Sequence, residues 1–232
     1  MHTKIWKYEG HPITLYYKAL FMQETQPPLQ TLQDIRRMME RSSRFISLSG
    51  WSGICAGVCA LAGASAAYLR IKKHNVQRGS INDEIGAGLD SASLINDLLW
   101  IAGIVFVAAF LSAFFFTYQR SKKNNTPIWD PISRRLIWNT VIPMIVGGAC
   151  ILRLLQVNAF ELVAPVSLIF YGLALLNASK YTLGEIRYLA FGQLALGIIN
   201  LWLTQYSLLF WALGFGVLHI IYGALMWWKY ER

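Results

Sequence analysis

A serine and a histidine in this sequence could together perform hydrolytic chemistry. Ser52 stands in the Gly-Trp-Ser-Gly stretch at residues 50–53, which has the form GxSG, and His219 lies far along the chain. A histidine that takes the proton of a serine hydroxyl makes that hydroxyl a nucleophile. A four-residue match in a segment rich in glycine and serine arises easily by chance. Ser52 and His219 are therefore weak candidates for the catalytic residues of an intramembrane serine hydrolase.

His219 also forms a possible pair with Gln193. Both stand inside apolar segments, roughly 18 Å and 15 Å from the ends of those segments if they are helical. That depth is near the middle of a membrane, where a polar group is costly and is a candidate for function. One interpretation is a ligand-binding site of a small-solute transporter. The other is a neutral histidine whose hydrogen bonds are satisfied by Gln193 or Tyr171.

The remaining polar residues indicate structure rather than chemistry. Arg153 and Glu161 flank a short connection and are expected to form an ion pair across it. Cys55, Cys59 and Cys150 lie in apolar segments without the spacing of metal ligands, so we expect no metal. The short motifs that bind nucleotides are absent from the sequence, and we expect no cofactor.

The segments that hold these residues are long and apolar. Of the 232 residues, 55% are hydrophobic and 14% are charged, whereas soluble domains have about 25% charged residues. The apolar residues fall into blocks of the length, about 20 residues, with which a helix crosses a bilayer. We expect an all-α polytopic transmembrane bundle, a single domain at residues 46–228, with about six spans at residues 46–69, 94–117, 136–155, 160–177, 183–203 and 207–228.

The first of these spans is rich in small residues. Gly53 and Gly57 form a GxxxG step, which lets two helix backbones approach closely in lipid. We expect this span to pack inside the bundle or to form a homo-oligomer with the same span of another copy.

The residues before the first span are mixed and basic. We expect residues 1–30 to be disordered, and residues 1–21 could be an over-extended start, with Met22 as the initiator. Residues 31–45 predict an amphipathic helix on the cytoplasmic side of the membrane. Its basic residues would contact lipid or a cytoplasmic protein partner; they are Arg36, Arg37, Arg41 and Arg44.

The positive charge predicts the orientation in the membrane. The net charge is +9, and most lysines and arginines fall at residues 1–45, 118–135, 178–182 and 229–232. This places both termini in the cytoplasm, with residues 229–232 as a short tail. The exception is the connection at residues 70–93, which we expect to be a solvated loop and which is basic at the opposite face. Contact with lipid headgroups accounts for this charge better than binding of nucleic acid.

Three stretches of the sequence resemble one group of proteins. They are LQDIRRMMERSSRFISLSGWSG at residues 32–53, YGLALLNASKYTLGEIRYLAFGQLALGIINLW at residues 171–202 and FWALGFGVLHIIYGALMWWKYER at residues 210–232. The chain resembles uncharacterised bacterial six-span membrane proteins, whose genes often lie beside one for a winged-helix transcription regulator. The resemblance implies a multi-pass protein of the bacterial inner membrane and brings no catalytic residue.

These patterns favour a non-enzymatic sensor or partner-binding module in the inner membrane. The small-residue span and the basic helix before it motivate this interpretation. Two alternatives stay open: a small-solute transporter that uses Gln193 and His219, and the less favoured serine hydrolase that uses Ser52 and His219.

Overall fold

The computed structural model describes residue 33 and residues 49–78, 84–123 and 129–232. The chain divides into two units, Met1–Ser43 and Arg44–Arg232, and the second unit contains all of the apolar segments. The predicted amphipathic helix at residues 31–45 and the N-terminal segment before it lie outside the described residues, except for Gln33, which is helical and exposed.

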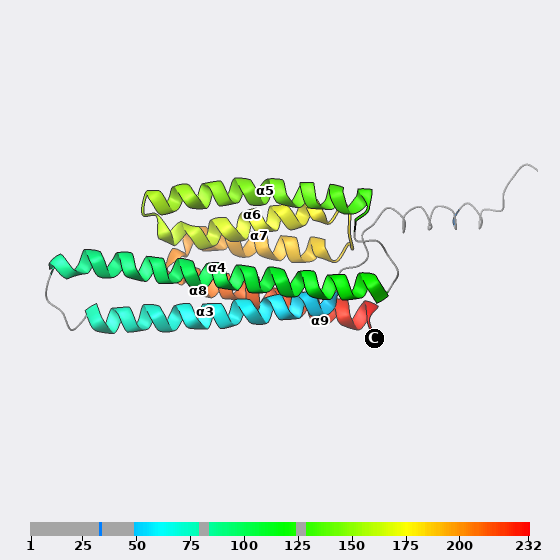
Figure 1. Ribbon diagram of the computed structural model, residues 1–232. Helices are drawn as coiled ribbons and strands as arrows, with labels where there is room; N and C mark the ends of the chain where they lie inside the picture. The colour runs from blue at the N-terminus through cyan, green and yellow to red at the C-terminus, as the bar shows by residue number, and fades with distance from the viewer. Residues whose placement is uncertain (1–32, 34–48, 79–83, 124–128) are drawn as a thin grey trace, which may run out of the picture. The chain divides into compact units, whose positions relative to one another are not determined.

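The described part of the second unit is helical, without a strand, which confirms the predicted all-α bundle. The order is α3 (Gly50–Arg78), α4 (Glu84–Lys123), α5 (Pro131–Gln156), η1 (Phe160–Leu162), α6 (Val163–Ala178), α7 (Ile186–Trp202), η2 (Thr204–Tyr206), α8 (Ser207–Trp211), η3 (Ala212–Leu218) and α9 (His219–Tyr230). Figure 1 shows these helices side by side. η1 runs directly into α6, and α8, η3 and α9 follow one another without a break.

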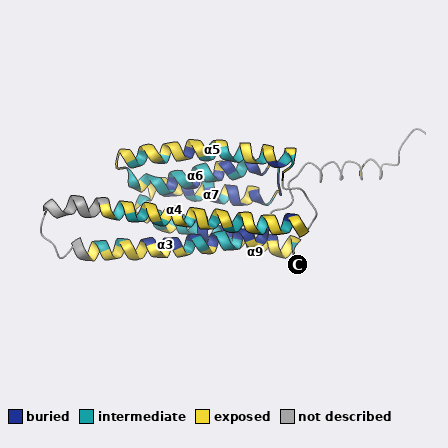
Figure 2. Cartoon of the chain, in the orientation of Figure 1, coloured by how far each residue is buried: buried dark blue, intermediate teal, exposed yellow. Residues whose placement is uncertain are grey.

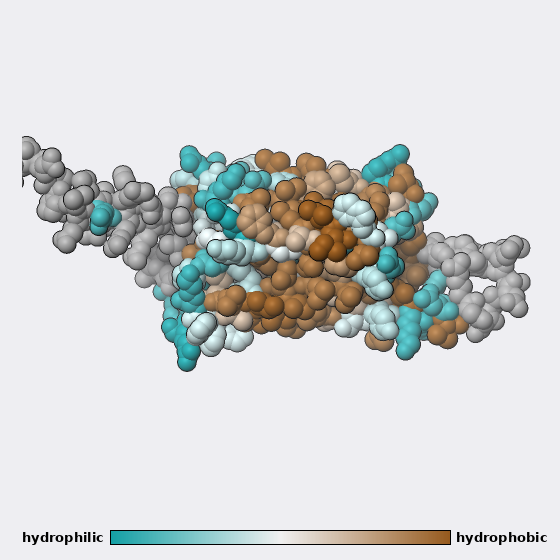
Figure 3. Space-filling model, turned by 180° about the vertical axis from the view of Figure 1, so that it is seen from behind, coloured by the Kyte–Doolittle hydropathy of each residue, from teal (hydrophilic) through white to brown (hydrophobic). Residues whose placement is uncertain are grey.

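Five of the described helical segments are long and apolar enough to cross a membrane, so the chain is a multi-pass membrane protein. The predicted span at residues 183–203 corresponds to α7, which is apolar but has 17 residues, or about 26 Å of helix. That is slightly less than the hydrocarbon thickness of about 30 Å. Figure 3 shows apolar residues across the middle of one face and hydrophilic residues towards its two ends.

The predicted solvated loop at residues 70–93 is wrong. α3 continues to Arg78 and α4 begins at Glu84, so both helices extend well beyond their predicted spans. Residues 70–78 contain neither glycine nor proline, and nothing therefore stops the helix where its apolar part ends. The hydropathy that predicts a span reports the depth of the membrane and not the end of the helix.

The helices form two groups that meet at the last helix, by which we mean the continuous run of α8, η3 and α9. α6 lies between α5 and α7, and α3 contacts both α4 and α9. The last helix joins the groups, since α8 and η3 each contact α3 and α7. Buried residues concentrate on α3, α6, α7 and the last helix, whereas α4 and α5 are mostly exposed (Figure 2). In a bilayer the exposed apolar faces of α4 and α5 are positions for lipid contact.

Candidate functional site

The predicted polar pair lies in a cluster of four residues, which we call the buried polar cluster: Tyr171, Gln193, Gly214 and His219. The hydroxyl of Tyr171 lies 2.7 Å from Nε2 of His219, and Nδ1 of His219 lies 3.0 Å from the carbonyl oxygen of Gly214. Since a carbonyl only accepts, Nδ1 carries a proton, and in a neutral imidazole Nε2 then accepts from the tyrosine hydroxyl. Both ring nitrogens of His219 are engaged, and Tyr171 is one of the two partners that the sequence suggested.

Gln193 joins the same cluster through the backbone rather than through the histidine. Its Nε2 donates to the carbonyl of Gly214 at 2.8 Å, so this carbonyl accepts from both predicted residues. The carbonyl belongs to η3, a π-helix. A Cβ on Gly214 would lie 2.6 Å from Oε1 of Gln193 and would overlap the side chain of Leu168, so a larger residue here would require both side chains to shift. π-helical turns inside α-helices are frequent at functional sites.

Three buried polar atoms of α7 and the last helix find no hydrogen-bond partner among the described residues. They are Oε1 of Gln193, Nδ2 of Asn200 and the hydroxyl of Tyr222. Gln193 and Asn200 are fully buried. Burying a polar group without a hydrogen-bond partner costs about 1–3 kcal/mol of stability. The cost is high within a bilayer, because no water is present there to bond the group. Such atoms are positions where a water molecule or a small polar ligand would bind favourably.

Ser52 and His219 are not brought together as a hydrolase requires. The hydroxyl of Ser52 donates to the carbonyl of Ser49 at 2.5 Å, within its own turn. Both ring nitrogens of His219 are occupied by Tyr171 and Gly214. The serine therefore lacks the hydrogen bond to a base on which nucleophilic attack depends, and this geometry does not support the hydrolase alternative.

The predicted small-residue row packs within the chain. A Cβ on Gly53 would lie 3.1 Å from Cα of Gly223, and one on Gly57 would lie 2.6 Å from the carbonyl oxygen of Gly216. α3 and the last helix thus approach with their backbones nearly in contact, as glycine rows permit in lipid. Because the last helix covers this face, a second copy cannot use it without displacing that helix.

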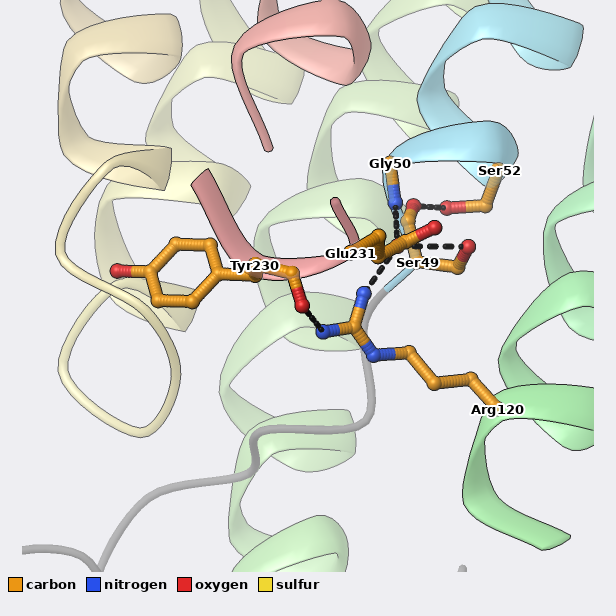
Figure 4. Close-up of polar contacts among 6 residues, drawn as sticks. All are labelled: Ser49, Gly50, Ser52, Arg120, Tyr230 and Glu231. Carbon is orange, nitrogen blue, oxygen red and sulfur yellow. Dashed lines mark hydrogen bonds and ion pairs between the residues drawn. The ribbon is translucent and has the colours of Figure 1, made fainter. Parts of the chain in front are cut away.

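A carboxylate that sequence reasoning missed holds the chain's C-terminal end against the start of α3. Oε1 of Glu231 accepts from the backbone N–H of Gly50 at 2.6 Å and from the hydroxyl of Ser49 at 3.0 Å, and it pairs with Arg120 from α4 (Figure 4). Arg120 also donates to the carbonyl of Tyr230 at 3.4 Å. An anion at a helix N-terminus satisfies free backbone N–H groups and the helix dipole. We call Ser49, Gly50, Arg120 and Glu231 the C-terminal clamp.

A second ionic contact lies where α7 begins. Glu185 pairs with Lys229 and accepts from the hydroxyl of Tyr230 at 2.8 Å. Burial raises the pKa of the Glu185 carboxyl, but the hydrogen bonds from Lys229 and Tyr230 outweigh it and leave the pKa below its usual value. This contact is more exposed than the clamp and ties the last helix to the start of α7.

The predicted ion pair between Arg153 and Glu161 is not formed in the described part of the chain. Arg153 instead donates to Oε1 of Gln156, one turn later in α5, at 3.3 Å. Both charged residues are exposed, so little is gained by ordering two long side chains in one geometry. The carbonyl of Glu161 accepts from the hydroxyl of Ser207 at 3.0 Å, which joins η1 to α8.

α3 and α4 extend beyond the ends of α5, α6 and α7 (Figure 1). α4 has 40 residues, or about 60 Å of helix, whereas a bilayer with its headgroups is about 40–45 Å thick. An α4 perpendicular to the membrane would thus project by roughly 15 Å, at the end of α4 that follows α3 in the chain. We call residues 74–78 and 84–92 the projecting hairpin.

The sequence and structure of the chain were compared with protein families, curated proteins and solved structures. No protein-family model matches it, and no curated protein and no solved structure is significantly similar to it. The resemblance to bacterial six-span proteins thus rests on the three sequence stretches alone.

Proposed function

We propose that this protein is a non-enzymatic membrane module that binds a protein partner through the projecting hairpin. The observation that carries this proposal is the length of α4, which exceeds the thickness of the bilayer and puts helical surface where a partner can reach it. Tyr171, Gln193 and His219 form hydrogen bonds between helices, and the hydroxyl of Ser52 and the ring of His219 bond to other groups and not to each other. A helical pair outside the membrane offers the kind of surface that other helices pack against.

The location and orientation belong to the same proposal. We place the protein in the bacterial inner membrane with both termini in the cytoplasm. The C-terminal clamp supports this, because it puts the start of α3 and the end of α9 at the same end of the bundle. The positive charge near that end, at Lys122, Lys123 and Lys229, fits the rule that cytoplasmic segments are rich in lysine and arginine. The hairpin would then face away from the cytoplasm.

Site-specific photocrosslinking in native membranes tests the partner. A photoreactive residue replaces Asn75, which is exposed on the hairpin, and the control replaces Trp129, which is 74% exposed between α4 and α5. We expect Asn75 to crosslink to one protein in a fixed ratio and Trp129 not to do so. Crosslinks to lipid alone at Asn75, or the same protein at both positions, would exclude the hairpin as a specific binding surface.

A small-solute transporter is the second candidate, and one observation favours it. Oε1 of Gln193 is fully buried, has no hydrogen-bond partner among the described residues and lies beside the π-helix. Transporters place binding sites near the middle of the membrane at interrupted helices. Gln193→Met keeps the shape of the side chain and removes its polar atoms. Solute uptake that disappears in this variant, while its melting temperature stays within a few degrees of wild type, would favour transport.

A further inference from the structure

A groove lies between α3 and the start of the last helix. It has a volume of about 550 Å³, and its walls include Leu61, Tyr68 and Leu69 from α3 and Tyr206, Leu209 and Ala212 from η2, α8 and η3. This volume is within the range of about 300–1,000 Å³ that is typical of small-molecule sites. Most of the wall is apolar, and we call the part that is lined by Tyr68, Gln205 and Tyr206 its polar end.

The depth of the groove places it within the membrane. Counted from Gly50 at about 1.5 Å per residue, Leu61 lies roughly 17 Å and Leu69 roughly 29 Å along α3. The hydrocarbon layer is about 30 Å thick. The groove thus spans the half of the bilayer that is remote from the C-terminal clamp, and its polar end reaches the headgroup level. A molecule that enters the groove from the side comes from the bilayer, so a membrane lipid reaches the groove more readily than a water-soluble ligand does.

Positive charge lies directly above the polar end of the groove. Lys72 follows Tyr68 by four residues and Lys73 follows Leu69 by four, so both are on the face of α3 that lines the groove. Both lysines are exposed, and neither forms an ion pair within the described residues. Arg70, in contrast, is paired with Asp97 on α4. Among the residues whose side chains the structure describes, the two lysines therefore leave a local excess of positive charge at the headgroup level.

This excess also departs from the expected charge distribution. The connection between α3 and α4 is the basic segment that does not fit an orientation with both termini in the cytoplasm. A bound anion would account for lysines at that face. We propose that the groove binds one acyl chain of a membrane phospholipid, whose phosphate is held by Lys72 and Lys73. This site lies below the hairpin and does not depend on the partner proposed above.

Native mass spectrometry of the full chain in mild detergent tests the phosphate contact. The probes are dioleoyl phosphatidylglycerol and dioleoylglycerol, which have the same chains but differ in the phosphate. We expect the double variant Lys72→Gln, Lys73→Gln to bind phosphatidylglycerol about tenfold more weakly, since each lysine near an anionic surface contributes roughly a fivefold factor before screening. Binding of dioleoylglycerol should not change. The matched control is Lys122→Gln, Lys123→Gln, which removes two adjacent exposed lysines at the other end of α4.

A second pair of variants tests the apolar part of the site. Ser65 is exposed and lines the groove, so Ser65→Phe should fill it and weaken both probes. Leu209→Gln changes the opposite wall and serves if Ser65→Phe does not fold. Equal loss of phosphatidylglycerol in the two lysine variants would overturn the proposal, as would unchanged binding after both groove substitutions. A dimer that Ser65→Phe dissociates would overturn it as well, because a second copy would then occupy the groove.

Discussion

The C-terminal clamp predicts a large stability difference between two chemically identical substitutions. Glu231→Gln keeps the size of the side chain but removes the charge that faces Arg120 and the N-terminus of α3. The side chains of Arg120 and Glu231 are only 12% and 16% exposed. Removing one partner of a buried pair costs about 3–5 kcal/mol. Because some exposure remains and glutamine still accepts from Ser49 and Gly50, we expect about 2–3 kcal/mol.

The matched control is Glu185→Gln at the same end of the bundle. Its partner Lys229 is 60% exposed, and exposed pairs contribute about 0–1 kcal/mol. For a chain of this size about 1 kcal/mol moves the melting temperature by about 2–4 °C. Glu231→Gln should therefore melt roughly 5–10 °C below wild type, and Glu185→Gln within about 3 °C of it, followed by tryptophan fluorescence in detergent.

The double variant Arg120→Met, Glu231→Met separates charge from shape. Replacing both partners of a buried pair by apolar groups is often neutral, so part of the lost stability should return relative to Glu231→Gln. Equal shifts for Glu231→Gln and Glu185→Gln would refute the assignment of the clamp as the buried member of the two contacts.

Three further predictions concern other contacts of the bundle. Gly57→Leu should destabilise the protein by at least about 1–3 kcal/mol, since the new side chain would overlap the backbone of the last helix. Its control is Gly103→Leu, which should be neutral in thermal unfolding because nothing lies within 4 Å of the Cβ position at Gly103. Tyr171→Phe should cost about 0.6–1.7 kcal/mol, and a double-mutant cycle with His219→Phe should recover that energy as coupling. The lowered pKa of Glu185 means that its contact stabilises the fold above the unfolded pKa of about 4.5 and is lost as the pH falls through the folded value. Glu185→Gln should therefore flatten the decline in melting temperature on acidification below about pH 5, by a small amount because its partner Lys229 is largely exposed.

The sequence predicted the fold class and most of the membrane-spanning segments because hydropathy over about 20 residues directly reflects the bilayer. It did not predict the ends of α3 and α4, since a helix continues through polar residues when no glycine or proline stops it. The small-residue row was recognised at Gly53 and Gly57. The glycines of the last helix, against which this row packs, were not identified. Close approach requires small residues on both helices, but the spacing within one helix does not say which other helix it contacts.

The polar contacts were predicted in part. Tyr171 was named as a partner of His219, and the hydrogen bond of 2.7 Å bears this out. The carbonyl of Gly214 was missed because it lies in a π-helix, which has no hydropathy period by which the sequence could reveal it. The clamp was missed because Arg120 and Glu231 are 111 residues apart. A lone acid in the otherwise basic chain end was the signal that could have identified it.

The π-helix permits a final test of how the last helix is held on both sides. A π-turn accommodates one more residue than an α-turn, so deleting Leu213 could return η3 to α-helix and leave the residues beyond it in phase. Deleting Ile221 within α9 would instead turn every later residue by about 100°, which removes Gly223 from α3 and Glu231 from the clamp. We expect the Ile221 deletion to prevent folding and the Leu213 deletion to give a folded protein in which Gln193 loses its bond to Gly214. If the Leu213 deletion is as damaging as the Ile221 deletion in size-exclusion chromatography and thermal unfolding, then the π-helix is required for the packing of the bundle and not only for the buried polar cluster.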